Sequence, residues 1–177
     1  MRWLSLLALF FSFQLFAAPK NQIANGNLTY GQEIFDTLQI NGTATLNGTI
    51  ILQRLQVNGS VSATNAQIGE LQVYGQAVLS HCTVKDKCAV TGSIKGAFCD
   101  FEKAITLTSD NSSFDVCTIA SIQVLKTKDH VTQTIELKGK TEITGLISFE
   151  SGNGQVIASK ESPIKEANVI GGKLIRR

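Results

Sequence analysis

The sequence predicts an all-β protein that folds as a single-stranded parallel β-helix, a triangular β-solenoid with about 17 residues in each turn. The first observation is a five-residue unit that returns almost unchanged, because LQING at residues 38–42 recurs as LQVNG at 55–59 and as LQVYG at 71–75. The second observation is regular spacing. Weaker copies follow at Cys88, Ile105 and Ile122, so the steps between successive starts are 17, 16, 17, 17 and 17 residues.

Three strands are expected in each turn. The apolar positions of the unit are two residues apart and therefore lie on one face of a strand. They form a first ladder of Leu38, Leu55, Leu71, Cys88, Ile105 and Ile122, and a second ladder of Ile40, Val57, Val73, Val90, Leu107 and Val124. A third ladder contains Ile51, Ile68, Val84, Phe101 and Ile119. A weaker middle strand directs inward the pairs Val61 and Ala63, Ala77 and Leu79, and Ile94 and Gly96.

Glycine ends the first strand in four successive turns, at Gly42, Gly59, Gly75 and Gly92. A sharp corner often needs a positive φ, which glycine adopts without steric cost. Three strands and three corners describe a coil whose turns stack about 4.8 Å apart, so six turns would form a rod of about 25–30 Å. An antiparallel sandwich of short strands is the structural alternative, but it does not predict identical residues in register every 17 positions.

The regular register covers only part of the chain. We expect the solenoid over residues 37–149, an N-terminal cap segment over 18–36 and a C-terminal cap or tail over 150–177. The run IELKG at residues 135–139 has the pattern of another first strand, although it begins 13 residues after Ile122 rather than 17. Residues 125–134 are therefore expected to form either a distorted turn or a protruding loop.

Residues 1–17 are typical of a secretory signal peptide. Arg2 gives a short basic start, residues 4–16 are almost wholly apolar, and Ala17 precedes the expected cleavage point. The apolar run is shorter than the roughly 20 residues that span a bilayer, and no later stretch is long and apolar enough to do so. We therefore expect an exported protein, periplasmic or extracellular, with no integral membrane segment after signal removal.

The serial [Leu/Ile/Val]-x-[Ile/Val]-x-Gly units over residues 38–124 resemble the bactofilins, bacterial proteins whose core is a compact triangular right-handed β-helix. The resemblance implies a coil whose ends stack on other copies, since family members polymerise end to end without nucleotide and serve as scaffolds, often at membranes. The chain departs from the family, which is typically cytoplasmic, in its signal peptide and its four cysteines.

The cysteines follow the repeat. Cys82, Cys99 and Cys117 are spaced 17 and 18 apart, each two residues before an inward ladder position, whereas Cys88 belongs to the first ladder. Four cysteines after a signal peptide predict disulfides, and neighbouring turns bring Cα atoms to about 4.8 Å, within the disulfide range. One connectivity joins Cys99 to Cys117 and Cys82 to Cys88, and another joins Cys82 to Cys99. A reduced, packed column is the alternative to both.

No metal site is expected, because His81 is adjacent to Cys82 and points outward while His130 lies in the irregular region. Asp100 and Glu102 are the best carboxylate pair for acid–base chemistry, but a solvated ion pair between Glu102 and Lys85 explains Glu102 adequately.

Five Asn-x-Ser/Thr triplets are glycosylation candidates or ordinary turn sequences. They begin at Asn27, Asn41, Asn47, Asn58 and Asn111.

These observations favour a secreted or periplasmic non-enzymatic β-solenoid that acts as a structural scaffold or surface interaction module, self-assembling through its ends. The alternative is an adhesin-like module that binds a glycan or host surface, and a small polysaccharide-active enzyme is a third. No cofactor motif is present. A formal net charge of +2 at pH 7 gives no reason to expect a nucleic acid partner.

Overall fold

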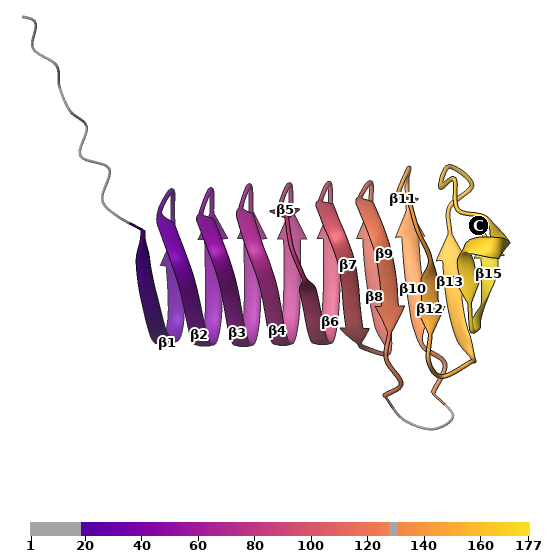
Figure 1. Cartoon of the computed structure of the whole chain (residues 1–177), viewed down its shortest axis with the longest axis horizontal. Coiled ribbons are helices and arrows are strands. Elements are labelled where there is room, and N and C mark those ends of the chain that lie inside the picture. The colour runs from indigo at the N-terminus through magenta and orange to yellow at the C-terminus, as the bar shows by residue number, and fades with distance from the viewer. Residues whose placement is uncertain (1–18, 128–130) are drawn as a thin grey trace, which may run out of the picture.

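The computed structural model describes residues 19–127 and 131–177, so the predicted signal peptide and His130 lie outside the described residues. The described chain is all-β, with 70% of it in strands. Fifteen strands pair in one parallel sheet that winds into a β-solenoid of about 9 turns (Figure 1). The predicted fold class is confirmed, and the stack is longer than the six turns expected from the sequence.

Four long strands open the stack: β1 (Lys20–Tyr30), β2 (Ile34–Asn47), β3 (Ile50–Thr64) and β4 (Gln67–Ser80). They are long because pairing continues through the glycine corner, where Gly42 pairs in register with Gly59 and Gly59 with Gly75. The second half is divided into shorter strands: β5 (Thr83–Val84), β6 (Cys88–Ala97), β7 (Asp100–Thr108), β8 (Asn111–Asp115), β9 (Thr118–Val124), β10 (Thr134–Lys138), β11 (Glu142–Ile143), β12 (Ile147–Phe149), β13 (Gly154–Ala158), β14 (Val169–Ile170) and β15 (Gly172–Arg176). One 3-10 turn, η1 (Glu166–Asn168), precedes β14.

The residues of each predicted ladder pair with one another in the sheet. In the first ladder Leu38 pairs with Leu55 and Leu55 with Leu71, and the series runs on through Cys88, Ile105 and Ile122 to Ile147. The second and third ladders also pair as expected. Every residue of these three ladders is buried, and burial of each large aliphatic side chain contributes about 1.5–3 kcal/mol.

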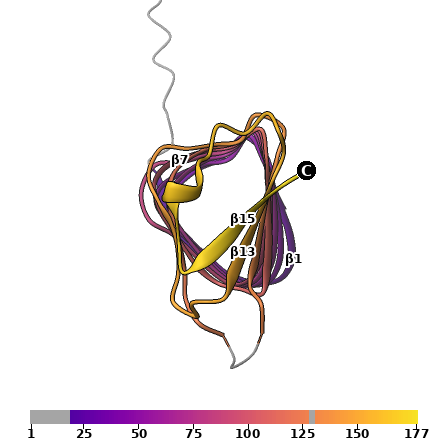
Figure 2. The same cartoon turned by 90° about the vertical axis from the view of Figure 1, so that its right-hand side faces the viewer.

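Viewed along the axis, the turns superimpose on one closed outline (Figure 2). The core inside it is narrow, and its largest buried side chains are Phe35, Phe101 and Phe114. The rings of Phe101 and Phe114 meet edge to face, with centroids 5.8 Å apart. A Cβ at Gly96 would lie 3.1 Å from Phe114. The middle strand therefore carries glycine at this inward position because the ring of the next turn occupies the space.

The expectation that residues 135–139 form another first strand is wrong. Strand β10 pairs with β8, with Ile135 opposite Ser112 and Leu137 opposite Phe114, so it is a middle strand. The next first strand is β12, whose Ile147 pairs with Ile122. The reason is an insertion between β9 and β10, at the corner that glycine occupies in earlier turns. Its described residues extend out from the coil, which confirms the protruding-loop alternative (Figure 1).

A buried glutamine holds the base of this inserted loop, residues 125–133. The Gln133 side chain is 1% exposed. Its Nε2 donates to the carbonyl oxygen of Ser109 at 3.0 Å and to that of Leu125 at 2.7 Å. Both ends of the loop are thus tied to the preceding turn, so the insertion does not disturb the register that follows it.

Parallel pairing also extends beyond residues 37–149 at both ends. Strand β1 pairs with β2 over its whole length, and β15 pairs with β13. At the N-terminal end, Gln22 Nε2 donates to Tyr30 Oη at 2.9 Å across the half-exposed inner face of β1. Within the described residues no strand pairs with the outer edge of β1.

The C-terminal end is closed differently. Residues 159–168 cross the last turns and place Ile164 in the core at 2% exposure. The Arg176 guanidinium donates to the carbonyl oxygens of Ser159 and Ser162, at 2.9 and 2.6 Å, and to that of Ile164. This clamp satisfies carbonyl groups that the sheet ladder no longer reaches. The two ends of the rod therefore present different surfaces.

Candidate functional site

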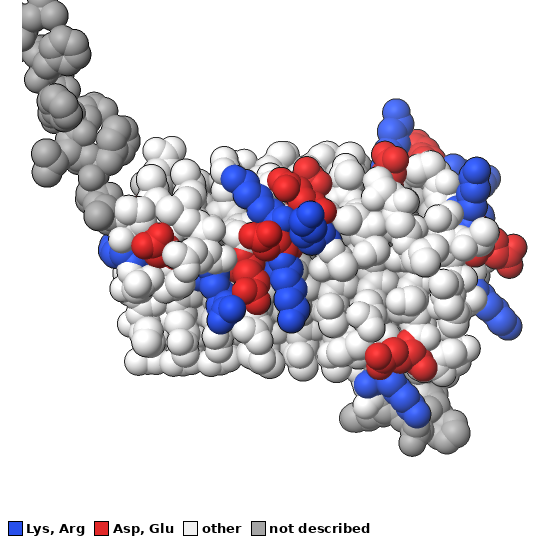
Figure 3. Space-filling model, viewed as in Figure 1, with Lys and Arg blue, Asp and Glu red and all other residues white. Residues whose placement is uncertain are grey.

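The edge of the coil at the glycine corner presents a ladder of amides. Asn41 Nδ2 donates to Asn25 Oδ1 at 2.9 Å, and Asn58 Nδ2 donates to Asn41 Oδ1 at 2.7 Å. All three side chains are exposed and lie one turn apart in register. Each amide holds its neighbour in a fixed orientation. The result is a regular row of donors and acceptors along the first turns, where Figure 3 shows no charged side chain on this edge.

The glycines behind this amide ladder are a steric requirement. Gly59 has a φ of +137°, and a Cβ on it would lie 2.1 Å from the carbonyl oxygen of Gly42. Real Cβ atoms do not approach an oxygen so closely, so no other residue fits. Because the backbone repeats closely at this corner, the side chain before each glycine is presented at the same place in every turn.

The amide ladder also bears on the glycosylation candidates. Asn41 and Asn58 are engaged with neighbouring amides, which supports their role in the turn. All five candidate asparagines, Asn27, Asn41, Asn47, Asn58 and Asn111, are exposed. Glycan attachment stays a prediction.

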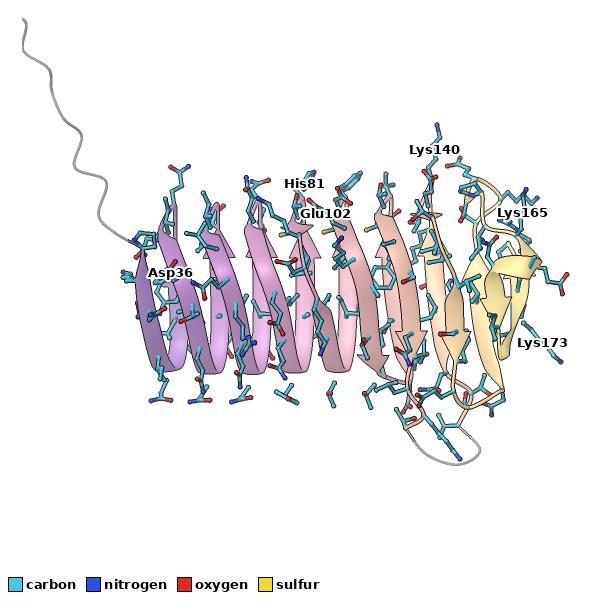
Figure 4. The ribbon with its side chains drawn as sticks, viewed as in Figure 1. Asp36, His81, Glu102, Lys140, Lys165 and Lys173 are labelled. Carbon is cyan, nitrogen blue, oxygen red and sulfur yellow. The ribbon has the colours of Figure 1, made fainter. Side chains whose placement is uncertain are left out.

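The corner between the middle and third strands has left-handed backbone geometry. Asn65, His81, Phe98 and Val116 occupy it in successive turns with φ of 53°, 53°, 53° and 50°. The His81 and Phe98 rings are stacked, with centroids 4.8 Å apart and an interplanar angle of 16°. Figure 4 shows His81 at this edge of the coil and Lys140 farther along it. We call His81, Phe98 and Val116 the corner ridge.

The corner ridge combines backbone strain with exposure. A non-glycine residue in this conformation costs about 1–2 kcal/mol, and a β-branched residue there is a rare outlier. Phe98 is nevertheless 52% exposed and Val116 40% exposed. Sequence analysis missed this ridge. The signal was available, because Gly48 and Asn65, residues that tolerate positive φ, stand at the same repeat position two turns and one turn before His81, respectively.

The cysteines lie where the repeat placed them. Cys82, Cys99 and Cys117 are buried in one inward column directly behind the corner ridge, and Cys88 is buried in the first ladder. The register follows from the flanking backbone bonds, in which Asp100 N donates to Cys82 O at 2.9 Å and Thr118 N donates to Cys99 O at 3.0 Å. All four are free thiols in this structure, so the disulfides stay a prediction.

The thiols of the column are electrostatically linked. Hydrogen bonding from Cys99 lowers the pKa of Cys117 below its ordinary value. The same contact raises the pKa of Cys99 to about 11. The pKa of Cys82 is raised by its hydrogen bond to Cys99 and by burial. Burial is the main reason that the pKa of Cys88 rises to about 12, and Cys99 adds a smaller effect. Each thiol of the column also donates to a backbone carbonyl oxygen two residues earlier, at 3.2–3.4 Å.

The carboxylate pair lies on the outer surface as predicted. Asp100 and Glu102 are exposed on β7, on either side of the buried Phe101. Neither carboxylate lines the two recesses described below. Within the part of the chain that the structure describes, no group of three or more His, Cys, Asp or Glu side chains could hold a metal ion.

A shallow groove runs over the outer face of the middle strands. It has a volume of about 350 Å³ and is lined mainly by Ser93, Lys95, Asn111, Ser113, Thr134 and Glu136, from β6, β8 and β10. A second recess of about 410 Å³ lies nearer the inserted loop, where Thr132, Asn153, Gln155 and Lys173 surround three glycines. Both recesses combine hydroxyl or amide groups with apolar surface, a mixture that suits a ligand with hydroxyl groups and C–H faces.

Two further results complete the description. Within residues 19–127 and 131–177, no helix is long and apolar enough to cross a membrane. Comparison with protein-family models, with curated proteins and with solved structures finds no match to this chain.

Proposed function

We propose that the protein is an exported, non-enzymatic β-solenoid that acts as a structural scaffold or surface interaction module. The observation that carries the proposal is the sparsely charged first half of the rod, where polar ladders repeat once per turn. Between residues 21 and 80 the charged side chains are only Glu33, Asp36, Arg54 and Glu70. Two of these, Arg54 and Glu70, neutralise each other in a pair of hydrogen bonds of 3.0 Å each.

A repeating neutral surface suits a repeating partner. Ladder groups recur at the spacing of parallel strands, about 4.8 Å, and individually weak hydrogen bonds add up when many engage at once. The amide ladder is already oriented by its own hydrogen bonds, which lowers the entropy lost on binding. A scaffold or an adhesive surface needs this kind of extended contact, whereas catalysis needs converging groups.

Self-association through an end of the rod is part of the proposal. The outer edge of β1 offers 11 residues of backbone with few charges, and an open strand edge is a template for pairing with another chain. At the C-terminal end the last strand, β15, is only 5 residues long, and its Arg176 is engaged with the carbonyl oxygens of Ser159 and Ser162. The N-terminal edge is therefore the end better suited to a second copy.

Sedimentation velocity of the chain lacking residues 1–17, over a wide concentration range, tests the scaffold proposal. We expect concentration-dependent assembly that weakens when lysine is placed on β1. A monomer at every concentration, together with no binding of the protein to any insoluble surface, would refute the proposal.

The groove over β6, β8 and β10 favours a second candidate, a glycan-binding module. Its hydroxyl and amide lining matches the hydrogen-bonding groups of a saccharide chain. A glycan array separates this candidate from the scaffold. Ser113→Arg would fill the groove, and Ser62→Arg, on the same outward face outside the groove, is the matched control. Loss of an array signal in the first variant alone would assign glycan binding to the groove.

A further inference from the structure

The three stacked thiols belong to a longer column of small buried side chains. The corner column consists of Thr49, Ala66, Cys82, Cys99, Cys117 and Thr141, one from each of six successive turns. The hydroxyl groups in this column form hydrogen bonds with backbone carbonyl oxygens. Thr49 Oγ1 donates to Gly31 O and Thr141 Oγ1 donates to Lys138 O, both at 2.7 Å. Threonine and alanine therefore fill this position well. Packing alone does not require three consecutive cysteines.

The centre of the thiol series differs from its ends. Cys99 interacts with both Cys82 and Cys117. Neighbouring turns place Cα atoms about 4.8 Å apart, inside the range of roughly 4.4–6.8 Å that a disulfide spans. Cys82 and Cys117 are two turns apart, about 9.6 Å by the same spacing, and cannot bond to each other. Any disulfide within the column must therefore include Cys99.

The surroundings distinguish the two partners of Cys99. Cys117 Sγ lies 3.5 Å from the position that a Cβ of Gly96 would occupy and donates to one carbonyl oxygen, that of Asp115 at 3.4 Å. Cys82 Sγ instead donates to two carbonyl oxygens of earlier residues, Ala63 at 3.4 Å and Ser80 at 3.3 Å. One turn before Gly96, the corresponding inward position is filled by the buried Leu79.

We propose that Cys82, Cys99 and Cys117 form a single-disulfide redox site in which Cys99 is the shared partner and Cys99–Cys117 is the preferred bond. Cys82 then remains a thiol, and Cys88 remains a packed thiol of the first ladder. This replaces the expectation of a second bond between Cys82 and Cys88. Cys82 lies in the corner column before β5 and Cys88 begins β6 in the first ladder, so β5 with its buried Val84 separates them along the chain.

The pKa shifts support the same pair. Interaction with Cys99 lowers the pKa of Cys117, so this thiol is the first to form a thiolate. The pKa of Cys82 is raised, so its thiolate is the least populated of the three. The thiolate is the reactive form in disulfide exchange. Cys117 is therefore the attacking group and Cys99 the resolving group.

The oxidant class is a disulfide, such as glutathione disulfide or an oxidised dithiol protein. The Cys117 thiolate attacks one sulfur of the oxidant, forms a mixed disulfide and releases one oxidant thiolate. Cys99 Sγ then attacks Cys117 Sγ, the mixed disulfide breaks, and the second oxidant thiolate leaves. The two released thiolates take up the two protons from Cys117 and Cys99. Both thiols are nearly fully buried, so the exchange requires the corner to open or occurs before the turns have closed.

The resulting bond is expected to be reducible. A disulfide prefers Cβ atoms about 3.5–4.5 Å apart, whereas parallel neighbours in a sheet stand near the strand spacing of about 4.8 Å. The backbone must contract slightly at one corner to form it. Strained disulfides have more oxidising potentials and belong to the labile class. The site would therefore respond to the redox state of its compartment.

Tryptic mapping of the purified chain after equilibration with glutathione disulfide tests the proposal directly. Each cysteine lies in a different tryptic peptide, at residues 55–85, 88–95, 96–103 and 104–126. We expect one crosslink, between peptides 96–103 and 104–126, and an intact mass lower by two hydrogens. Two disulfides, a Cys82–Cys88 crosslink, or four free thiols after prolonged oxidation would each overturn the proposal.

Serine variants make the test sharper, because the corner column already accepts hydroxyl residues and should fold with serine. Cys99→Ser should abolish the intramolecular disulfide completely. Cys117→Ser should shift the crosslink to Cys82–Cys99, and Cys88→Ser, the matched control, should leave the crosslink unchanged. Circular dichroism confirms that each variant is folded. An intramolecular disulfide that persists in folded Cys99→Ser would refute the shared-partner arrangement.

Discussion

The rings of His81 and Phe98 are stacked at 4.8 Å, and both residues have a φ of 53°. Two strained residues in adjacent turns thus share one contact on the outside of the coil. An aromatic pair of this kind contributes about 0.5–1.5 kcal/mol, which partly offsets the strain of a left-handed backbone. Val116 continues the same edge without a ring partner, so its strain is less compensated.

Val116→Asn should therefore stabilise the protein. Asparagine adopts positive φ more readily than a β-branched residue, and we expect a gain of about 0.5–1 kcal/mol in the free energy of unfolding. Val78→Asn is the control, because Val78 is similarly exposed but lies in a regular strand, where asparagine is disfavoured. Thermal melts followed by circular dichroism measure both. A lower melting temperature for Val116→Asn would show that the valine side chain contributes more than its backbone costs.

The first ladder makes a direct prediction about the core. Leu55 is 0% exposed and pairs with Leu38 and Leu71, so Leu55→Asp would bury an unpaired charge in a narrow core. We expect a loss of more than about 4 kcal/mol, enough to prevent folding. Gln56→Asp changes the next residue, which is outside the core, and should fold normally. Comparison of β-type circular dichroism in the two variants tests the register.

The glycine corner predicts a contrast between two alanine substitutions. In Gly59→Ala the new Cβ would meet Gly42 O at 2.1 Å, whereas in Gly26→Ala no atom lies within 4 Å. Both glycines have positive φ, so both variants bear a conformational cost of about 1 kcal/mol. Only Gly59→Ala should lose about 3 kcal/mol or more in chemical denaturation. Equal losses would mean that the backbone relaxes around the new methyl group.

Burial of Cys88 predicts a loss of stability at alkaline pH. Its pKa rises from the ordinary 9.0 to about 12 in the folded chain, so the unfolded chain releases this proton first. The contribution of this thiol to the free energy of unfolding is fully present below pH 9. It is lost as the pH rises from about 9 to about 12, and the total loss is a few kcal/mol. Urea denaturation at several pH values measures how steeply the free energy of unfolding falls with pH. In Cys88→Ala, which has no thiol to ionise at this position, the free energy of unfolding should fall less steeply.

Assembly through the N-terminal edge can be tested with single charges. Ile23 lies on β1 and is 72% exposed, and Ile170 lies on β14 near the other end and is 51% exposed. Lysine on an edge strand discourages pairing, so Ile23→Lys should lower the sedimentation coefficient at high concentration. Ile170→Lys should not. If only Ile170→Lys reduced assembly, the contact would lie at the C-terminal end.

The sequence by itself determined the fold class, the three apolar ladders and the inward column of cysteines. It did so because a parallel coil stacks each repeat on the last, so a period of about 17 residues translates directly into register. The same logic failed at residues 135–139. An apolar-polar-apolar run has the same pattern on any side of the coil, and only pairing with β8 decided that β10 is a middle strand.

Tertiary structure alone decided the features that depend on contact between turns. The backbone has a left-handed corner at His81, Phe98 and Val116. The sequence did not reveal it, because bulky residues are disfavoured at positive φ. The asymmetry of the ends also depended on contacts between distant segments, such as the Arg176 clamp on Ser159 and Ser162. The repeat carries no information about these contacts, because its regularity is absent where the chain stops stacking on itself.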